Sequence, residues 1–282
     1  RGIAELAARA GLAVRLTDAR DGAAAAAIAA IGDALRRDVE KGRLEADAAT
    51  AIRGRLAPTT PDAAAGGDLV IEAIVEDLAK KQALFAALEA AARPDAILAT
   101  NTSSLPVARI GEGMKDAGRF AGLHFFNPPT RMRIVEIVRA PGTSAATIAA
   151  LEALSAQLGQ RAIVVADTPG FLVNHLGRGL IGEALRILDD GAADPAALDA
   201  IATGALGFRM GPCALLDLVG LDVSVATSET VWRGFGEEPR FRPAAIGRAR
   251  VEAGLLGRKS GRGFFTYGDD GRAIVADEAA NA

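Results

Sequence analysis

One of the two histidines in this chain lies in a segment that can place it opposite a carboxylate. Residues 122–138 read GLHFFNPPTRMRIVEIV, with His124 in one apolar run and Glu136 in the next. Pro128 and Pro129 favour a turn between the runs, so that two paired strands bring His124 to face Glu136. Such a carboxylate fixes the tautomer of the ring and stabilises the imidazolium formed on proton uptake. A hydrogen-bonded core histidine beside a solvated glutamate fits the same spacing, so both interpretations stay open.

Further polar side chains lie where ligands of parallel sheets bind, beyond the carboxyl ends of strands. Asp18 ends one predicted strand, where a carboxylate can accept hydrogen bonds from the ribose hydroxyls of a dinucleotide. Ser103 in NTSS and Asn174 in DTPGFLVN are placed to bind a substrate oxygen. Each of the three also fits a turn or a helix cap. No Cys, His and Asp cluster has the spacing of metal ligands, so we expect no metal.

The elements that must position these residues alternate between strand and helix in the first part of the chain. Residues 22–56 have helical spacing with a break near Lys41, which predicts two long helices. The apolar runs predict strands at residues 12–18, 68–77, 96–104, 120–126, 134–138 and 161–167. This alternation predicts an α/β fold with a doubly wound, mostly parallel sheet and an inserted helical hairpin.

The pattern changes near Thr168. From Leu172 onwards the segments are helical and are joined by short connections that contain Gly and Pro, and no segment has a convincing strand pattern. We therefore expect two domains, an α/β domain of residues 1–167 and an all-α domain of residues 168–282. Apolar helices such as LIGEALRILDD and MGPCALLDLVGLD can pack an internal core or a dimer interface.

The composition narrows the class of protein. Half of the residues are apolar, 24% are charged and the net charge is -3, as in a globular protein without a general nucleic-acid-binding surface. No apolar run reaches membrane-spanning length, so we expect no membrane partner. Cys213 is the single cysteine and cannot form an intramolecular disulfide, and a reducing cytoplasm is the simplest expected location.

Seven segments resemble, in order, the L-3-hydroxyacyl-CoA dehydrogenase family, which includes bacterial 3-hydroxybutyryl-CoA and 3-hydroxyadipyl-CoA dehydrogenases. The segments are GIAELAARAGLAVRLTDAR, VIEAIVEDLAKKQALF, ATNTSSLPV, GLHFFNPPTRMRIVEIV, DTPGFLVN, MGPCALLDLVGLD and LGRKSGRGFFTY. The resemblance implies a Rossmann-like NAD-binding domain followed by a helical dehydrogenase and dimerisation domain. It implies the oxidation of a short-chain L-3-hydroxyacyl-CoA to the 3-oxoacyl-CoA, with NAD as cofactor and a homodimer as the assembly.

The resemblance also implies roles for single residues. His124 is the general base for the substrate hydroxyl, and Glu136 orients it and balances its charge. Ser103 and Asn174 contact the region of the reacting oxygen.

Cofactor and coenzyme A contacts are implied in the same way. The residues implied to hold NAD are Asp18 at the adenosine ribose, Glu76, Lys81 and Ser103 in the site, and Lys259 from the helical domain. Lys41 is implied to contact coenzyme A, and Arg36, Arg37 and Arg43 add a local positive cluster near it.

Three expectations qualify this assignment. The family's first strand and glycine-rich turn have no counterpart here, so we expect a partial sequence whose sheet lacks a central strand. The segment FRPAAIGRARVEAGLLGRKSGRGFF resembles the 3-hydroxyadipyl-CoA dehydrogenases of phenylacetate breakdown, which makes the dicarboxylic substrate an alternative. A non-catalytic NAD-binding protein, as in lens crystallins of similar sequence, is the alternative from another class.

Overall fold

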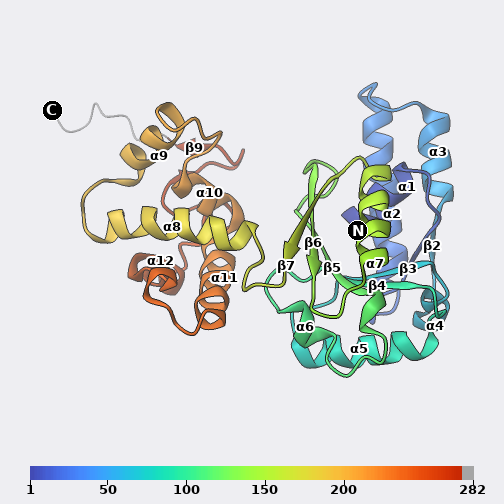
Figure 1. The fold of residues 1–282 in the computed structure, drawn as a ribbon. Coiled ribbons are helices and arrows are strands. Elements are labelled where there is room, and N and C mark those ends of the chain that lie inside the picture. Colours follow the sequence, from blue (N-terminus) through green and yellow to red (C-terminus); the bar gives the residue numbers. More distant parts are fainter. Residues whose placement is uncertain (275–282) are drawn as a thin grey trace. The chain divides into compact units, whose positions relative to one another are not determined.

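The computed structural model describes residues 1–274, which form two compact units, Arg1–Phe171 and the part that starts at Leu172 (Figure 1). In the first unit, five strands form one sheet in the order β3-β4-β5-β6-β7. Their bounds are β3 Leu69–Glu72, β4 Ile97–Thr100, β5 Phe120–Phe125, β6 Ile134–Arg139 and β7 Arg161–Ala166. Only the β5 and β6 pair is antiparallel within this sheet, which confirms the mostly parallel arrangement.

Helices cover both faces of this sheet. Apolar side chains of α5 (Leu78–Ala91) and α6 (Val107–Ile110) form one core with Leu98, Phe120 and Val138. On the opposite face, α1 (Gly2–Arg9) and α7 (Ala145–Gln157) pack on alternate strand residues, among them Leu123, Phe125, Val135 and Ile137. The predicted doubly wound α/β fold is therefore confirmed (Figure 1). Because strand side chains alternate between faces, His124 and Glu136 point to the α5 and α6 side.

The predicted helical insertion is present as α2 (Ala23–Glu40) and α3 (Ala46–Gly54). Ile28, Ile31 and Leu35 of α2 pack with Ile52 of α3 in a core of their own. The predicted end of this insertion at residue 56 is wrong, because Leu56 lies in a strand and not in the second helix. This strand, β2 (Leu56–Pro58), pairs in parallel with β1 (Val14–Leu16) as a sheet separate from the other five strands.

The predicted strand 68–77 is shorter in the structure. It ends at Glu72, where the side chain turns back and its Oε1 accepts a hydrogen bond of 2.7 Å from the Ile74 backbone N–H. Ile74 and Val75 are 43% and 62% exposed, so these two apolar residues belong to a surface loop. The helix α4 (Pro61–Ala65) and the 3-10 turn η1 (Ala117–Arg119) complete the first unit.

The second unit is helical, as expected. Its helices are α8 (Val173–Asp189), α9 (Pro195–Gly204), α10 (Pro212–Val219), α11 (Leu221–Gly234) and α12 (Ala245–Glu252), with 3-10 turns η2 (Pro239–Phe241) and η3 (Arg258–Ser260). The core gathers Ile181, Leu185, Leu216, Leu221 and Ala244. No helix within residues 1–274 has the length and hydropathy needed to cross a bilayer.

One short hairpin of the second unit was not predicted. It pairs β8 (Thr266–Tyr267) with β9 (Ala273–Ile274). The buried carboxylate of Asp217 anchors the preceding loop and β8 to α10, because it accepts hydrogen bonds of 2.9 Å from the Phe264 and Phe265 N–H groups and the Tyr267 hydroxyl.

Candidate active site

The predicted pairing of His124 with Glu136 is present in the structure. The two residues are register partners of β5 and β6, and His124 Nδ1 lies 2.8 Å from Glu136 Oε2. His124 is 7% exposed and Glu136 is 2% exposed. A carboxylate at this distance favours the tautomer with a proton on Nδ1, which leaves the lone pair of the ring on Nε2. The pair can therefore accept a proton at Nε2 and balance the resulting charge inside the protein.

Neighbouring side chains hold the histidine in place. The His124 ring packs edge-on to Phe126, with ring centroids 5.0 Å apart, and lies 5.8 Å from the Phe171 ring. Asn101, directly after β4, accepts a hydrogen bond of 2.9 Å at Oδ1 from the Phe125 backbone N–H. This bond ties the end of β5 to the neighbouring strand and limits the movement of the residue before it, His124.

A buried charge network links the ends of β3 and β4 to α5. The Lys81 side chain is 1% exposed, and its Nζ lies 2.6 Å from Glu72 Oε1 and 3.2 Å from Glu76 Oε2. Glu72 Oε2 accepts a further hydrogen bond of 2.7 Å from the Thr100 hydroxyl. A buried ammonium with two carboxylates has its charge fully compensated. Lys81 therefore acts within the protein, as the centre of this network.

Glu76 connects this charge network to the loop that contains Ser103. Its Oε1 accepts hydrogen bonds from the Thr102 hydroxyl, from the Ser103 N–H at 3.1 Å and from the Ser104 N–H at 3.2 Å. Burial raises the pKa of Glu76, but the bonds from Thr102 and Lys81 outweigh it and hold the pKa below its ordinary value. Glu76 is thus ionised at neutral pH and fixes the backbone of Ser103, whose own side chain is exposed.

Asp18 lies two residues beyond the end of β1, with its side chain 38% exposed. Its Oδ1 accepts hydrogen bonds from the Arg20 backbone N–H at 2.9 Å and from Arg20 Nε at 3.3 Å. These bonds lower the pKa of Asp18, so the carboxylate is charged at neutral pH. An accessible carboxylate beyond a parallel strand suits the ribose hydroxyls of a dinucleotide, and the residues present therefore fit NAD.

The remaining predicted site residues lie on helices or turns. Lys41 is exposed and follows α2 as its C-cap. Asn174 lies in the first turn of α8, in the second unit. Lys259 lies in η3 of the same unit, where its Nζ is 2.5 and 2.6 Å from the two carboxylate oxygens of Asp222. The first unit thus brings together His124 with Glu136, and Glu76 and Lys81 with the Ser103 loop.

Sequence reasoning missed Glu72, Thr102 and Asn101, which position the predicted residues. A signal for Glu72 was present, because it is the one charge within the apolar run LVIEAIV. A carboxylate inside a buried strand needs a partner. Lys80 and Lys81, eight and nine residues later on the next predicted helix, were the available cations, and in the structure Lys81 is the partner.

Within residues 1–274 the structure holds no group of His, Cys, Asp and Glu side chains arranged to bind a metal ion. The buried contact between His124 and Glu136 suits this histidine to proton transfer.

Sequence profiles of known families match nearly the whole chain. Residues 1–168 match the 3-hydroxyacyl-CoA dehydrogenase NAD binding domain, and residues 170–267 match the C-terminal domain of the same enzymes. A probable 3-hydroxybutyryl-CoA dehydrogenase of Bacillus subtilis is 39% identical over 94% of this chain and 93% of its own length. A 3-hydroxyadipyl-CoA dehydrogenase of Escherichia coli is 40% identical over 99% of this chain, which spans 59% of that longer protein.

Solved structures agree with these matches. A 3-hydroxybutyryl-CoA dehydrogenase from Escherichia coli superposes with a TM-score of 0.93 at 40% identity, over 99% of this chain and 59% of the other. The (S)-3-hydroxybutyryl-CoA dehydrogenase of Ralstonia eutropha gives 0.91 at 36% identity, over 95% of both chains. The chain therefore belongs to the 3-hydroxyacyl-CoA dehydrogenase family, whose enzymes are NAD-dependent oxidoreductases.

Proposed function

We propose that this protein oxidises a short-chain L-3-hydroxyacyl-CoA to the 3-oxoacyl-CoA, with His124 as the general base. The observation that carries the proposal is the buried contact of 2.8 Å between His124 Nδ1 and Glu136 Oε2. An alcohol proton is too weakly acidic to leave unaided at neutral pH, whereas an imidazole accepts a proton there. The family supplies the reaction type, and the pair supplies a residue suited to its proton transfer.

The proposed step separates a proton from a hydride. NAD, when bound, supplies the acceptor for the hydride that leaves C3 of the substrate. The hydroxyl proton passes to His124 Nε2 as the O–H bond breaks, and the C–O bond becomes a carbonyl. Glu136 accepts the hydrogen bond from His124 Nδ1 throughout the reaction. The imidazolium is therefore paired with a carboxylate, and no uncompensated charge forms in the buried site. In the reverse reaction His124 returns the proton to the carbonyl oxygen.

The residues proposed to hold NAD differ in how they act. Asp18 has an exposed carboxylate for the adenosine ribose, and the loop of Ser103 offers an exposed hydroxyl. Lys81 is buried and paired, so its proposed contribution passes through Glu76 and the backbone of this loop. Lys259 is 46% exposed and contacts both carboxylate oxygens of Asp222, and its ammonium has a third N–H for the proposed contact with the cofactor.

The proposed coenzyme A contact lies at the helical insertion. Lys41, Arg37 and Arg43 are all exposed near the end of α2, and Arg36 beside them is paired with Asp33. A local positive surface attracts the phosphates of coenzyme A even though the whole chain is acidic. Neutralising Lys41 as Lys41→Met should raise the KM for the acyl-CoA at low salt, and this difference should shrink as ionic strength rises.

The test of the proposed function is NADH formation by the full-length protein with racemic 3-hydroxybutyryl-CoA and with each resolved enantiomer. We expect turnover of the L form and no turnover of the D form. Binding of NAD without oxidation of any 3-hydroxyacyl-CoA would contradict the proposal and favour a non-catalytic NAD-binding protein.

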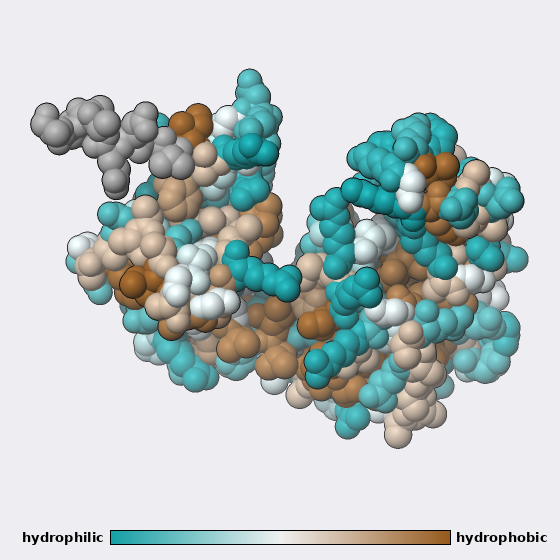
Figure 2. Space-filling view, turned by 90° about the horizontal axis from the view of Figure 1, so that it is seen from above, coloured by the Kyte–Doolittle hydropathy of each residue, from teal (hydrophilic) through white to brown (hydrophobic). Residues whose placement is uncertain are grey.

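We also propose a homodimer formed through the second unit. Large apolar side chains are exposed along α8 and α10, and Figure 2 shows brown areas on the surface of this unit. They include Leu172, Leu176, Leu180, Leu218 and Val219. Exposed apolar surface of this extent is typical of a protein interface. Light scattering should give twice the mass of the chain, and Leu176→Glu should shift the protein toward monomer.

A cytoplasmic location is proposed from the reaction, because it draws on NAD and coenzyme A thioesters, and from the single cysteine, Cys213, which is buried and forms no disulfide. Cell fractionation with an antibody against the protein tests this directly. Recovery in a secreted or membrane fraction would contradict it.

A further inference from the structure

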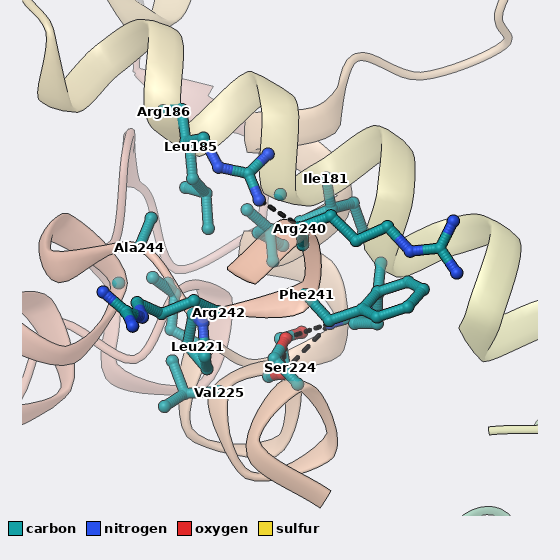
Figure 3. Close-up of a pocket in the computed structure, with 16 residues that line it drawn as sticks. Ile181, Leu185, Arg186, Leu221, Ser224, Val225, Arg240, Phe241, Arg242 and Ala244 are labelled. Carbon is teal, nitrogen blue, oxygen red and sulfur yellow. Dashed lines mark hydrogen bonds between the residues drawn. The ribbon is translucent and has the colours of Figure 1, made fainter. Parts of the chain in front are cut away.

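A small cavity lies inside the second unit between α8, α11 and the segment Pro239–Ala244 (Figure 3). Its free volume is about 20 Å³, within a wider hollow of about 460 Å³ that includes open solvent. A volume of this size holds about one water molecule. The cavity therefore accepts the polar end of a ligand and not a whole molecule.

One wall of the cavity carries Arg178, a partly buried cation that has no carboxylate beside it. Arg178 Nη1 donates to the Ser224 backbone oxygen at 3.0 Å and to the Ser228 hydroxyl at 3.2 Å. Arg178 Nε is buried and has no hydrogen-bond partner in the described part of the chain, and no ion pair involves this residue there. Burial lowers the pKa of Arg178, which reflects the unfavourable state of a charge without a counterion.

A second polar atom of the same cavity is also without a partner. Ser224 is 3% exposed, and its hydroxyl forms no hydrogen bond with residues 1–274. Most buried polar groups in native proteins are paired, so two unpaired polar groups at one cavity point to a polar partner that enters it. The partner must accept hydrogen bonds, because a guanidinium N–H can only donate.

The charge of the cavity shows which acceptor fits. None of the described residues that line it is acidic, while Arg186, Arg240 and Arg242 line it together with Arg178. Arg186 and Arg240 are paired with Glu183 and Glu238. The surplus charge is therefore positive, which favours an anion over water. Since Nη1 of Arg178 is already occupied, Nε and Nη2 form the remaining edge, which matches the two oxygens of a carboxylate.

The position of Arg178 along α8 relates this cavity to the substrate. Asn174, the proposed contact of the reacting oxygen, precedes Arg178 by four residues, so the two share one face of the helix about 6 Å apart along its axis. A 3-hydroxyadipyl group carries its terminal carboxylate three carbons beyond the C3 hydroxyl. A 3-hydroxybutyryl group ends one carbon beyond C3 and has no charge there.

We propose that Arg178 and Ser224 bind the terminal carboxylate of a dicarboxylic 3-hydroxyacyl-CoA such as 3-hydroxyadipyl-CoA. The proposal rests on the proposed function and narrows its substrate class. The carboxylate accepts hydrogen bonds from Arg178 Nε and Nη2 and from the Ser224 hydroxyl, and it neutralises the charge of the guanidinium. A substrate of equal length without the carboxylate leaves Arg178 Nε and the Ser224 hydroxyl unpaired and is bound less well.

The test compares 3-hydroxyadipyl-CoA with 3-hydroxyhexanoyl-CoA, which has the same chain length, in the wild type and in Arg178→Met. We expect wild-type kcat/KM to be higher for the adipyl substrate. In Arg178→Met this value should fall roughly 10- to 150-fold, the range for hydrogen bonds to a charged group, while the hexanoyl value changes by less than about threefold. Arg233→Met is the matched control, because Arg233 is 70% exposed on α11 and its loss changes the net charge equally.

Other outcomes are equally informative. A preference for the hexanoyl substrate, or an equal loss for both substrates in Arg178→Met, would overturn the carboxylate site and leave the proposed dehydrogenase intact. If Arg178→Met does not fold, Ser224→Ala replaces it, and a loss confined to the adipyl substrate supports the site.

A binding measurement separates this proposal from the proposed function. Adipate should raise the melting temperature of the wild type and of Arg233→Met, and not that of Arg178→Met, while hexanoate should have a weaker effect. If no 3-hydroxyacyl-CoA is oxidised but this adipate effect is present, the proposed function fails and the anion site stands. If the adipate effect is absent in the wild type, the site is contradicted.

Discussion

Two cations, the buried Lys81 in the first unit and the partly buried Arg178 in the second, have opposite surroundings. Lys81 contacts the carboxylates of Glu72 and Glu76, whereas the cavity wall around Arg178 contains no acidic side chain among the described residues. In the first unit the charge is balanced within the protein, and the balance fixes the Ser103 loop. In the second unit no acidic side chain of the cavity wall balances the charge of Arg178, and we propose that a ligand carboxylate does so. This difference indicates that Lys81 positions other residues of a site, whereas Arg178 is proposed to bind a substrate.

The largest effect should come from another buried group of the first unit, the carboxylate of Glu136. In Glu136→Gln the side-chain amide can donate a hydrogen bond to His124 Nδ1, which favours the tautomer with the proton on Nε2, where the lone pair is needed. We expect kcat to fall roughly 10²- to 10⁴-fold with little change in the melting temperature. Steady-state NADH formation measures this, and a loss below about threefold would show that the pairing has no role in proton transfer.

Breaking the balanced network should mainly reduce stability. Lys81→Met leaves the buried carboxylate of Glu72 without its cation, so the free energy of unfolding should fall by about 3–5 kcal/mol in urea titrations. The double variant Glu72→Gln with Lys81→Met removes both charges and should recover most of that loss. A single variant as stable as the wild type would mean that the network does not hold this edge of the sheet.

Glu76 should make stability depend on acid pH. Its folded-state pKa lies below its ordinary value of 4.5, because hydrogen bonds and Lys81 outweigh its burial. Its stabilisation is therefore complete above pH 4.5 and is lost as pH falls through the lower folded pKa. Unfolding midpoints of the wild type should decline more steeply than those of Glu76→Gln as pH falls below 4.5. Parallel curves would contradict the assignment of Glu76 as the ionised anchor of the Ser103 loop.

The smallest effect should be on the stability of Arg178→Met. Replacing a partly buried cation that lacks a counterion by an apolar side chain removes an unfavourable charge and also two hydrogen bonds. We expect the free energy of unfolding to change by less than about 1 kcal/mol without ligand. A loss as large as that of Lys81→Met would show that the two cations serve the same structural purpose.

Much of the fold was open to prediction because period-2 and period-3.6 patterns are local. The apolar runs at residues 120–125 and 134–139 are recognisable as strands, and a turn at the two prolines between them can bring His124 to face Glu136, as the observed register does. The strand β2 could not be predicted in this way, because three residues carry too little pattern and their pairing partner is remote. The β8 and β9 hairpin could not be predicted because its strands are also too short to carry a pattern.

The residues around the candidate site were harder to predict than those in it. The contact between Glu72 and Lys81 depends on the rotation of α5 against the sheet, which the spacing of charges does not fix. Arg178 is harder still, since the absence of a partner is visible only when every neighbour has been placed. The sequence alone does not distinguish Lys81 from Arg178. The side chains packed around each of them indicate different roles.

The most direct test of the central claim is His124→Gln, measured by NADH formation and by NAD binding in the same preparation of the full-length protein. Gln keeps a polar side chain of similar size but cannot take up the substrate proton at neutral pH. We predict that kcat falls roughly 10²- to 10⁴-fold while the Kd for NAD and the melting temperature stay at their wild-type values. Turnover close to wild type would contradict the account and remove His124 from the reaction.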